Sequence, residues 1–117
     1  MTLRITNATR GTELASRALA ARSFWSRLVG LLGRARLEAG EGLVIERSSS
    51  IHMMFMRFAI DAVYVDKSGR VIKTVSDLKP FRVSGARGGR SVIELPAGTI
   101  AQTGTAAGDE LHFEEAS

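Results

Sequence analysis

The 117-residue sequence contains no cysteine. The chain therefore has no disulfide bond, no thiolate metal ligand and no thiol nucleophile, which excludes thiol redox chemistry and zinc–cysteine sites. Histidine is scarce too, because His52 and His112 are the two imidazoles and they do not have the spacing of a paired metal-binding motif. We therefore expect no bound metal ion and no cofactor.

Long apolar runs and prolines are also rare. No stretch of about eighteen apolar residues occurs, and the first residues lack the apolar core of a signal peptide. Pro80 and Pro96 are the two prolines, and no linker interrupts the chain. We therefore expect one domain over residues 1–117, no membrane span and a cytoplasmic location.

Acidic residues are the minority charge, with 12 Asp and Glu against 16 Lys and Arg and a net charge of +4. The basic excess lies in residues 1–36, where seven arginines accompany Glu13 alone. Such asymmetry can attract nucleic acid or an acidic partner, but spaced arginines more often form a solvated face. Nucleic-acid binding is therefore a secondary hypothesis.

Short apolar runs separated by turn residues fill most of the chain. Their composition predicts strands at residues 3–6, 43–46, 51–56, 61–66, 70–76, 91–95 and near 110–113. Many short strands with regular turns are typical of all-β architectures rather than of parallel α/β sheets. We therefore predict a mainly β fold, a small sandwich or barrel-like domain.

One short helix is predicted near residues 23–33. Apolar side chains recur there at helical spacing, Ser23 suits the N-cap, and Gly33 suits the end of the helix. The preceding residues 12–20 are rich in Ala, Leu and Arg. Their composition by itself leaves helix and strand open for that segment.

The segment SIHMMFMRFAIDAVYVDKSGRVI, residues 50–72, resembles the signature of a prokaryotic family, the domain of unknown function 192. Weaker matches follow the family's order at residues 27–34, 42–45, 92–98 and 103–109. The resemblance thus spans nearly the whole chain. It implies a compact β-sandwich or barrel-like domain with a short helix, and a strand over residues 12–20. It implies no activity.

This sequence departs from the family pattern at two places. Many members carry Trp-Met and later Asn-Thr where this chain has His52-Met53 and Arg57-Phe58. Many also have proline where Ala59 stands. If the segment forms a site, the resemblance implies that its specificity differs here.

Four polar residues are candidates for a ligand-binding site: Ser50, His52, Asp61 and Glu94. Residues 51–56 are apolar on both faces of an extended strand, which predicts a central, buried strand in which His52 needs a polar partner. Asp61 opens the next strand, and Glu94 lies in the middle of residues 91–95. Both carboxylates can meet the imidazole if these strands are neighbours.

Two interpretations of this set stay open. It can form a polar pocket that holds a ligand or supports proton transfer, or a buried network that fixes strand register, as polar groups in sheets more often do. Asp61 can alternatively cap backbone N–H groups after a bend. A Ser50–His52–Asp61 triad is disfavoured, because side chains two apart on a strand are roughly 7 Å apart and no nucleophile elbow is present.

Our preferred hypothesis is a β domain that binds a small ligand or a protein partner near His52, with no catalysis assumed. The first alternative is a nucleic-acid-binding protein that uses the basic amino-terminal third and the loop at residues 84–90, with Arg87 and Arg90. That loop lacks the interleaved aromatic residues that stack bases. The second alternative is an enzyme of unknown reaction, because the sequence does not decide whether the chain is an enzyme.

Overall fold

The computed structural model describes residues 2–21, 37–53 and 56–116. The elements in these ranges are β1 (Thr2–Asn7), β2 (Thr12–Ala21), β3 (Glu41–Glu46), β4 (Ser50–His52), β5 (Ile60–Val65), β6 (Val71–Leu78), β7 (Val83–Gly85), β8 (Ser91–Pro96), α2 (Thr99–Thr103) and β9 (Leu111–Glu115). The prediction of a mainly β fold is confirmed.

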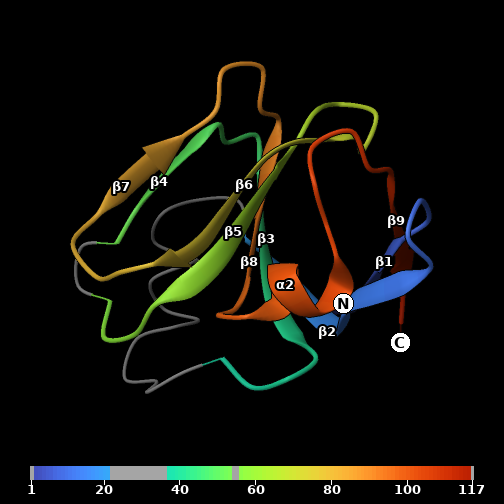
Figure 1. The fold of residues 1–117 in the computed structure, drawn as a ribbon, viewed down its shortest axis with the longest axis horizontal. Helices are drawn as coiled ribbons and strands as arrows, with labels where there is room; N and C mark the ends of the chain where they lie inside the picture. Colours follow the sequence, from blue (N-terminus) through green and yellow to red (C-terminus); the bar gives the residue numbers. More distant parts are fainter. Residues whose placement is uncertain (1, 22–36, 54–55, 117) are drawn as a thin grey trace.

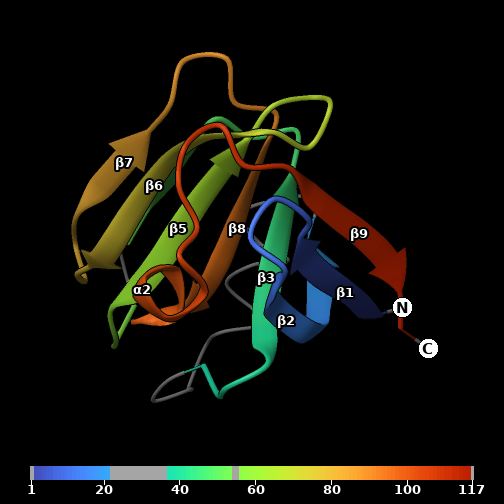
Figure 2. The ribbon, with the colours of Figure 1, turned by 45° about the vertical axis from the view of Figure 1, so that its right-hand side comes forward.

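Seven strands form one sheet in the order β6-β5-β8-β3-β2-β1-β9, and β4 pairs with β7 in a separate two-stranded sheet. The large sheet curls into a half-barrel, in which β9 and β1 are turned steeply against β5 and β6 (Figures 1 and 2). Its pairs are antiparallel except for β2 and β3. The register between β1 and β2 shifts between Leu3 and Thr6. Such bulges bend a strand and increase its twist.

The two edges of the large sheet meet at one corner of the half-barrel. The backbone N–H of Val71 donates to the carbonyl of Asp109 at 2.8 Å, and the N–H of Leu111 donates to the carbonyl of Gly69 at 2.9 Å. Arg70 and Glu110 form an ion pair beside these bonds, at 3.2 Å. Backbone groups that an open sheet leaves unpaired are thereby satisfied at this corner.

Apolar side chains pack against both faces of the large sheet. Alternate residues of β5 face opposite sides, so Val63 and Val65 belong to the core on the concave side, while Ala62 and Tyr64 belong to the core on the other side. Ile100 of α2 packs into the concave core. The small sheet supplies Ile51 to the other core. A strand buried on both faces explains the continuous apolar run of β5.

Most predicted strands agree with the structure. The predictions at residues 3–6, 43–46, 61–66, 70–76, 91–95 and 110–113 correspond to β1, β3, β5, β6, β8 and β9. The strand that the family resemblance implies over residues 12–20 is confirmed as β2. The helix predicted near residues 23–33 lies outside the described residues. Within the described ranges, no helix is long and apolar enough to cross a membrane.

The prediction of a central strand at residues 51–56 was wrong. β4 covers Ser50–His52, and among the described strands it pairs with β7 alone, so it is not central to a sheet. Directly beyond it, the N–H of Met53 donates to the carbonyl of Arg82 at 2.7 Å, and the carbonyl of Met53 accepts a bond from the N–H of Phe81 at 2.8 Å. Residues 54–55 of the predicted strand lie outside the described residues. Met53 and Met56 are buried because this segment covers the large sheet, rather than because it lies within it.

Candidate functional site

Asp61 lies at the start of β5 and is fully buried. Its Oδ2 accepts hydrogen bonds from the backbone N–H groups of Gly98 at 3.1 Å and Ile100 at 2.8 Å, where α2 begins. Its Oδ1 accepts a bond from the N–H of Asp77 at 2.9 Å, near the end of β6. Asp61 therefore caps backbone groups and holds α2 at one end of the half-barrel.

Glu94 is also fully buried, but it faces the opposite side of the sheet. It pairs with Ala62 of β5, whereas Asp61 pairs with Leu95. Successive residues of a strand point to opposite faces, so β5 and β8 are neighbours and yet the two carboxylates lie on different sides. Strand adjacency alone does not bring them together.

Ser50 and His52 line an open pocket of about 680 Å³ at the edge of the small sheet, to which Lys73 and Ser84 also contribute. Neither Asp61 nor Glu94 lines it. The Lys73 ammonium donates to the carbonyl of Gly85 at 2.6 Å. Half of the predicted set thus shares one shallow pocket, and a ligand-binding role for Ser50 and His52 stays a prediction.

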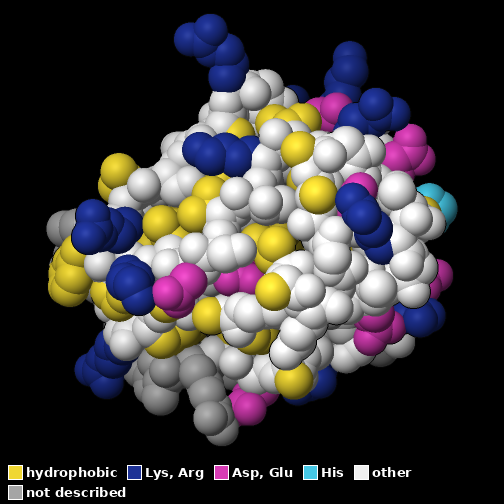
Figure 3. Space-filling model, in the orientation of Figure 1, with side chains coloured by type: hydrophobic (Ala, Val, Ile, Leu, Met, Phe, Trp, Pro, Cys, Tyr) yellow, Lys and Arg dark blue, Asp and Glu magenta, His cyan; other side chains and the backbone are white. Residues whose placement is uncertain are grey.

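An apolar surface flanked by cations adjoins this pocket. Phe81 and Val83 are 67% and 75% exposed, and Val83 lies directly opposite His52 in the β4–β7 pair. Figure 3 shows hydrophobic side chains beside Lys and Arg side chains at its left edge, over the segment that leads into β7. The exposed side chains of Arg57 and Arg82 make no hydrogen bond or ion pair within the described ranges.

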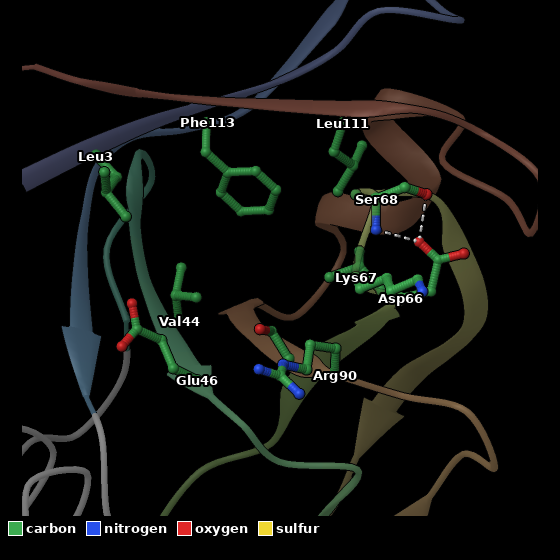
Figure 4. A pocket seen from close by; sticks show the side chains of 12 residues that line it. Leu3, Val44, Glu46, Asp66, Lys67, Ser68, Arg90, Leu111 and Phe113 are labelled. Atoms are coloured by element: carbon green, nitrogen blue, oxygen red, sulfur yellow. Dashed lines mark hydrogen bonds between the residues drawn. The ribbon is translucent and has the colours of Figure 1, made fainter.

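A second pocket, of about 420 Å³, lies at the open end of the half-barrel, at the far end of β5 from α2. Figure 4 shows Leu3, Val44, Leu111 and Phe113 around its interior, on strands that are distant in the sequence. Sequence reasoning missed this site, because these residues become neighbours only when the sheet curls. The available signal was weak: Val65 and Leu111 stand at strand ends, and Arg90 directly precedes β8.

Four charged side chains surround the mouth of this pocket: Glu46, Asp66, Lys67 and Arg90. Asp66 accepts hydrogen bonds from the Ser68 hydroxyl at 2.8 Å and from the backbone N–H groups of Ser68 and Arg70, at 2.9 and 3.0 Å. These donors, the Ser68 hydroxyl first, lower the pKa of Asp66 below its ordinary value. Glu46 takes part in another interaction. Within the described ranges, the side chains of Lys67 and Arg90 have no such partner.

A further polar cluster joins the closed corner to the turn between β1 and β2. Asp109 Oδ2 accepts bonds from Asn7 Nδ2 at 2.9 Å, from Arg10 Nε at 3.0 Å and from the N–H of Ala106 at 3.0 Å. The bond from Arg10 and then the bond from Asn7 lower the pKa of Asp109, against the opposing effect of burial. These bonds join three segments of the chain, which is a structural role. No group of three or more metal-ligating side chains occurs among the described residues.

Two curated proteins are similar to this chain over most of its length. A UPF0127 protein of Thermococcus sibiricus is 29% identical over 113 residues, covering 92% of this chain and 73% of that protein. A UPF0127 protein of Pyrococcus furiosus is 31% identical over 111 residues, with 92% and 95% covered.

Two solved structures share the fold. A protein of unknown function from Novosphingobium aromaticivorans has a TM-score of 0.79 at 22% identity, covering 96% of this chain and 84% of that one. A Sinorhizobium meliloti protein named "putative transcription regulator" also has a TM-score of 0.79, at 21% identity, with 95% and 91% covered. At such identities the likeness shows the fold alone.

The family model of DUF192, described as "Uncharacterized ACR", matches residues 5–113. The match covers most of the curled sheet, the closed corner and, except for Leu3, the lining of both pockets. The chain therefore belongs to the DUF192 family, as the resemblance of residues 50–72 indicated.

Proposed function

We propose that this chain is a small-molecule-binding domain and that its ligand occupies the open end of the half-barrel. The observation that carries the proposal is the apolar interior of that pocket, which opens to solvent between Leu3, Val44 and Phe113. Its volume of about 420 Å³ falls within the range of small-molecule clefts, roughly 300–1,000 Å³. Mouths of β-barrels are among the places where such clefts occur.

The two ends of the half-barrel differ in a way that supports this site. At one end α2 is fixed by the Asp61 carboxylate and inserts Ile100 into the concave core. At the other end no such plug is present among the described elements, and Phe113 keeps 37% of its surface exposed. A ligand with an apolar body would bury this ring, and burying apolar surface favours binding.

The test is saturable binding of the fluorescent probe 1-anilinonaphthalene-8-sulfonate. Ser91 is the first residue of β8 and lines the pocket, so Ser91→Phe is designed to fill the cavity from its wall. Ser76→Phe places the same ring at an exposed position of β6 that does not line this pocket. We expect one probe to bind per chain in the wild type and in Ser76→Phe, and binding to be lost in Ser91→Phe.

Equal probe binding by all three proteins, with folds verified by NMR spectra, would place the probe elsewhere and would contradict the proposal. Probe binding that never saturates would do the same, because a single cavity has a fixed capacity.

A second candidate function is binding of single-stranded nucleic acid at the surface around His52. The Phe81 ring projects into solvent among cations, and exposed aromatic rings beside arginines can stack bases and contact phosphates. Two of the described arginines of the basic amino-terminal segment are already engaged in ion pairs. Arg4 pairs with Glu13 at 2.6 Å, and Arg10 pairs with Asp109 at 3.0 Å.

This candidate is tested by fluorescence anisotropy with an oligothymidylate. Binding should weaken steeply with salt, and Arg82→Gln should reduce the salt dependence because one phosphate contact is lost. Phe81→Gly should weaken binding through lost stacking, at unchanged salt slope. Binding that is absent at low salt, or that neither variant alters, would dismiss this candidate.

A further inference from the structure

We infer that the ligand of the half-barrel pocket is a monoanionic amphiphile, a carboxylic acid with an apolar chain, whose carboxylate pairs with Arg90. This inference rests on the proposed function and names the chemical class of the ligand. The apolar chain would lie against Leu3, Val44 and Phe113, and the carboxylate would remain at the mouth.

The sign of the unpaired charge at the mouth selects an anion. Asp66 is engaged with the backbone of its own turn, and Glu46 has another interaction. Arg90 and Lys67 are the rim charges whose side chains have no hydrogen bond or ion pair among the described residues. Both are cations. A bound anion therefore gains a partner without having to displace an existing one.

The backbone fixes Arg90 in place. Its N–H donates to the carbonyl of Val65 at 2.8 Å, and its carbonyl accepts a bond from the N–H of Ser48 at 2.9 Å. The base of the side chain is thus held between the end of β5 and the segment before β4. In Figure 4 the side chain extends along the edge of the pocket, on the side that faces Glu46. A planar guanidinium at such a position suits a carboxylate, which it can bind through two parallel hydrogen bonds.

The interior restricts the rest of the ligand. Leu3, Val44, Val65, Leu111 and Phe113 supply its apolar lining. The Ser68 hydroxyl, a polar group of the lining, already donates to Asp66. Groups with several charges would lose hydration inside without compensation, and a polar body is therefore disfavoured. One acidic group joined to an apolar chain satisfies both the mouth and the interior.

The experiment is an NMR titration with four probes: octanoate, hexanoate, octanol and acetate. Octanoate should shift backbone signals of the pocket lining, at Leu111 and Phe113. It should bind about sixteenfold more tightly than hexanoate, because each added methylene is worth about fourfold in Kd, or about 0.8 kcal/mol. Acetate should not bind measurably, because it lacks the apolar chain.

Three variants test the role of the cations. Arg90→Gln should raise the Kd of octanoate about fivefold, the upper range for a solvent-exposed ion pair, and leave the Kd of octanol unchanged. Lys67→Gln should act in the same direction but more weakly, because an ammonium is a flexible point charge. Arg87→Gln is the matched control. Arg87 is an exposed arginine of the same loop that does not line the pocket, and its loss should change neither Kd.

The outcomes separate this inference from the proposed function. If neither octanoate nor octanol shifts the lining residues, the pocket itself is refuted as a ligand site. If both bind, and Arg90→Gln changes neither Kd or changes both equally, the pocket is still a ligand site. Recognition of a carboxylate by Arg90 is then contradicted. If acetate binds as tightly as octanoate, the site recognises a bare anion and the amphiphile is overturned.

Discussion

Asp61 connects three segments of the chain through one carboxylate. It accepts bonds from the N–H groups of Asp77, Gly98 and Ile100, and it is fully buried. The sequence placed Asp61 in a candidate ligand pocket and also offered capping of backbone N–H groups as an alternative. The observed contacts match the capping alternative. A single sequence identifies such a residue but not the donors that will surround it, because they come from distant turns.

Asp61→Asn should lower the free energy of unfolding by about 3 kcal/mol. The side-chain NH2 of asparagine would face backbone N–H groups, which would then stay buried without an acceptor. Asp77→Asn is the control. It keeps the backbone N–H that Asp61 accepts, tolerates the positive φ of 56°, and loses only an exposed contact to Lys79. It should cost less than about 1 kcal/mol. Urea unfolding measures both, and equal costs would contradict the assigned role.

Asp109 should give the fold an acid-sensitive contribution. Its pKa in the folded state lies below the ordinary value of 3.8, through the bonds from Arg10 and Asn7. A lowered pKa contributes stability that is fully present above the unfolded value and is lost as the pH falls through the folded value. Asp109→Asn should therefore cost about 1 kcal/mol at pH 7. The gap in unfolding free energy between this variant and the wild type should shrink below about pH 4.

Urea unfolding of both proteins between neutral and acidic pH measures this gap. A gap that stays constant to pH 3 or widens on acidification would show that the Asp109 charge does not stabilise the fold.

Among the elements, the turn from β6 into β7 contains a residue in an unfavourable conformation. Phe81 has a φ of 67°, the left-handed region that costs a non-glycine residue roughly 1–2 kcal/mol. Its ring is 67% exposed, so burial returns little of that cost. The turn is held by bonds from Phe81 N–H to the Met53 carbonyl at 2.8 Å and from Arg82 N–H to the Lys79 carbonyl at 3.3 Å.

Phe81→Gly should therefore raise the free energy of unfolding by about 0.5–1 kcal/mol, because glycine adopts this φ without steric cost. Val83→Gly is the contrast. Val83 is even more exposed but has no positive φ, so glycine there should destabilise the short strand β7. Thermal unfolding compares the two. A lower melting temperature for Phe81→Gly would mean that the ring makes a stabilising contact.

On the scale of the whole molecule, closure of the sheet at one corner depends on a close approach at Gly69. Gly69 has a φ of 87°, and a Cβ there would lie 3.0 Å from the Leu111 carbonyl oxygen. Gly88 has a φ of 85°, but a Cβ there would meet nothing within 4 Å. The two glycines thus share a positive φ, and a Cβ would make a close contact at Gly69 but not at Gly88.

Gly69→Ala should cost more than Gly88→Ala, because both substitutions strain the backbone and only the first pushes β9 away from β6. We expect about 1 kcal/mol for Gly88→Ala, and about 1–3 kcal/mol more for Gly69→Ala. Hydrogen exchange should also become faster at Leu111, whose N–H donates across the corner. If both substitutions lower the free energy of unfolding equally and hydrogen exchange at Leu111 is unchanged, the close approach at Gly69 does not hold the corner closed.

The sequence by itself determined most of the strands and the family. Alternation and turn residues reveal where β1, β3, β5, β6, β8 and β9 lie, because strand patterning is local. The ordered motifs of residues 50–72 indicated the family that the match over residues 5–113 shows. Tertiary structure decided which face each side chain occupies and which strands neighbour one another.

This difference between local sequence pattern and tertiary structure explains why the predicted site residues do not all meet and why the half-barrel pocket was not predicted. Asp61 and Glu94 are on adjacent strands but on opposite faces, a difference of one residue in register that no local pattern reports. The half-barrel pocket joins residues as distant as Leu3, Arg90 and Phe113. They meet because bulges and twist curl the sheet, and curvature is a property of paired strands rather than of any one segment.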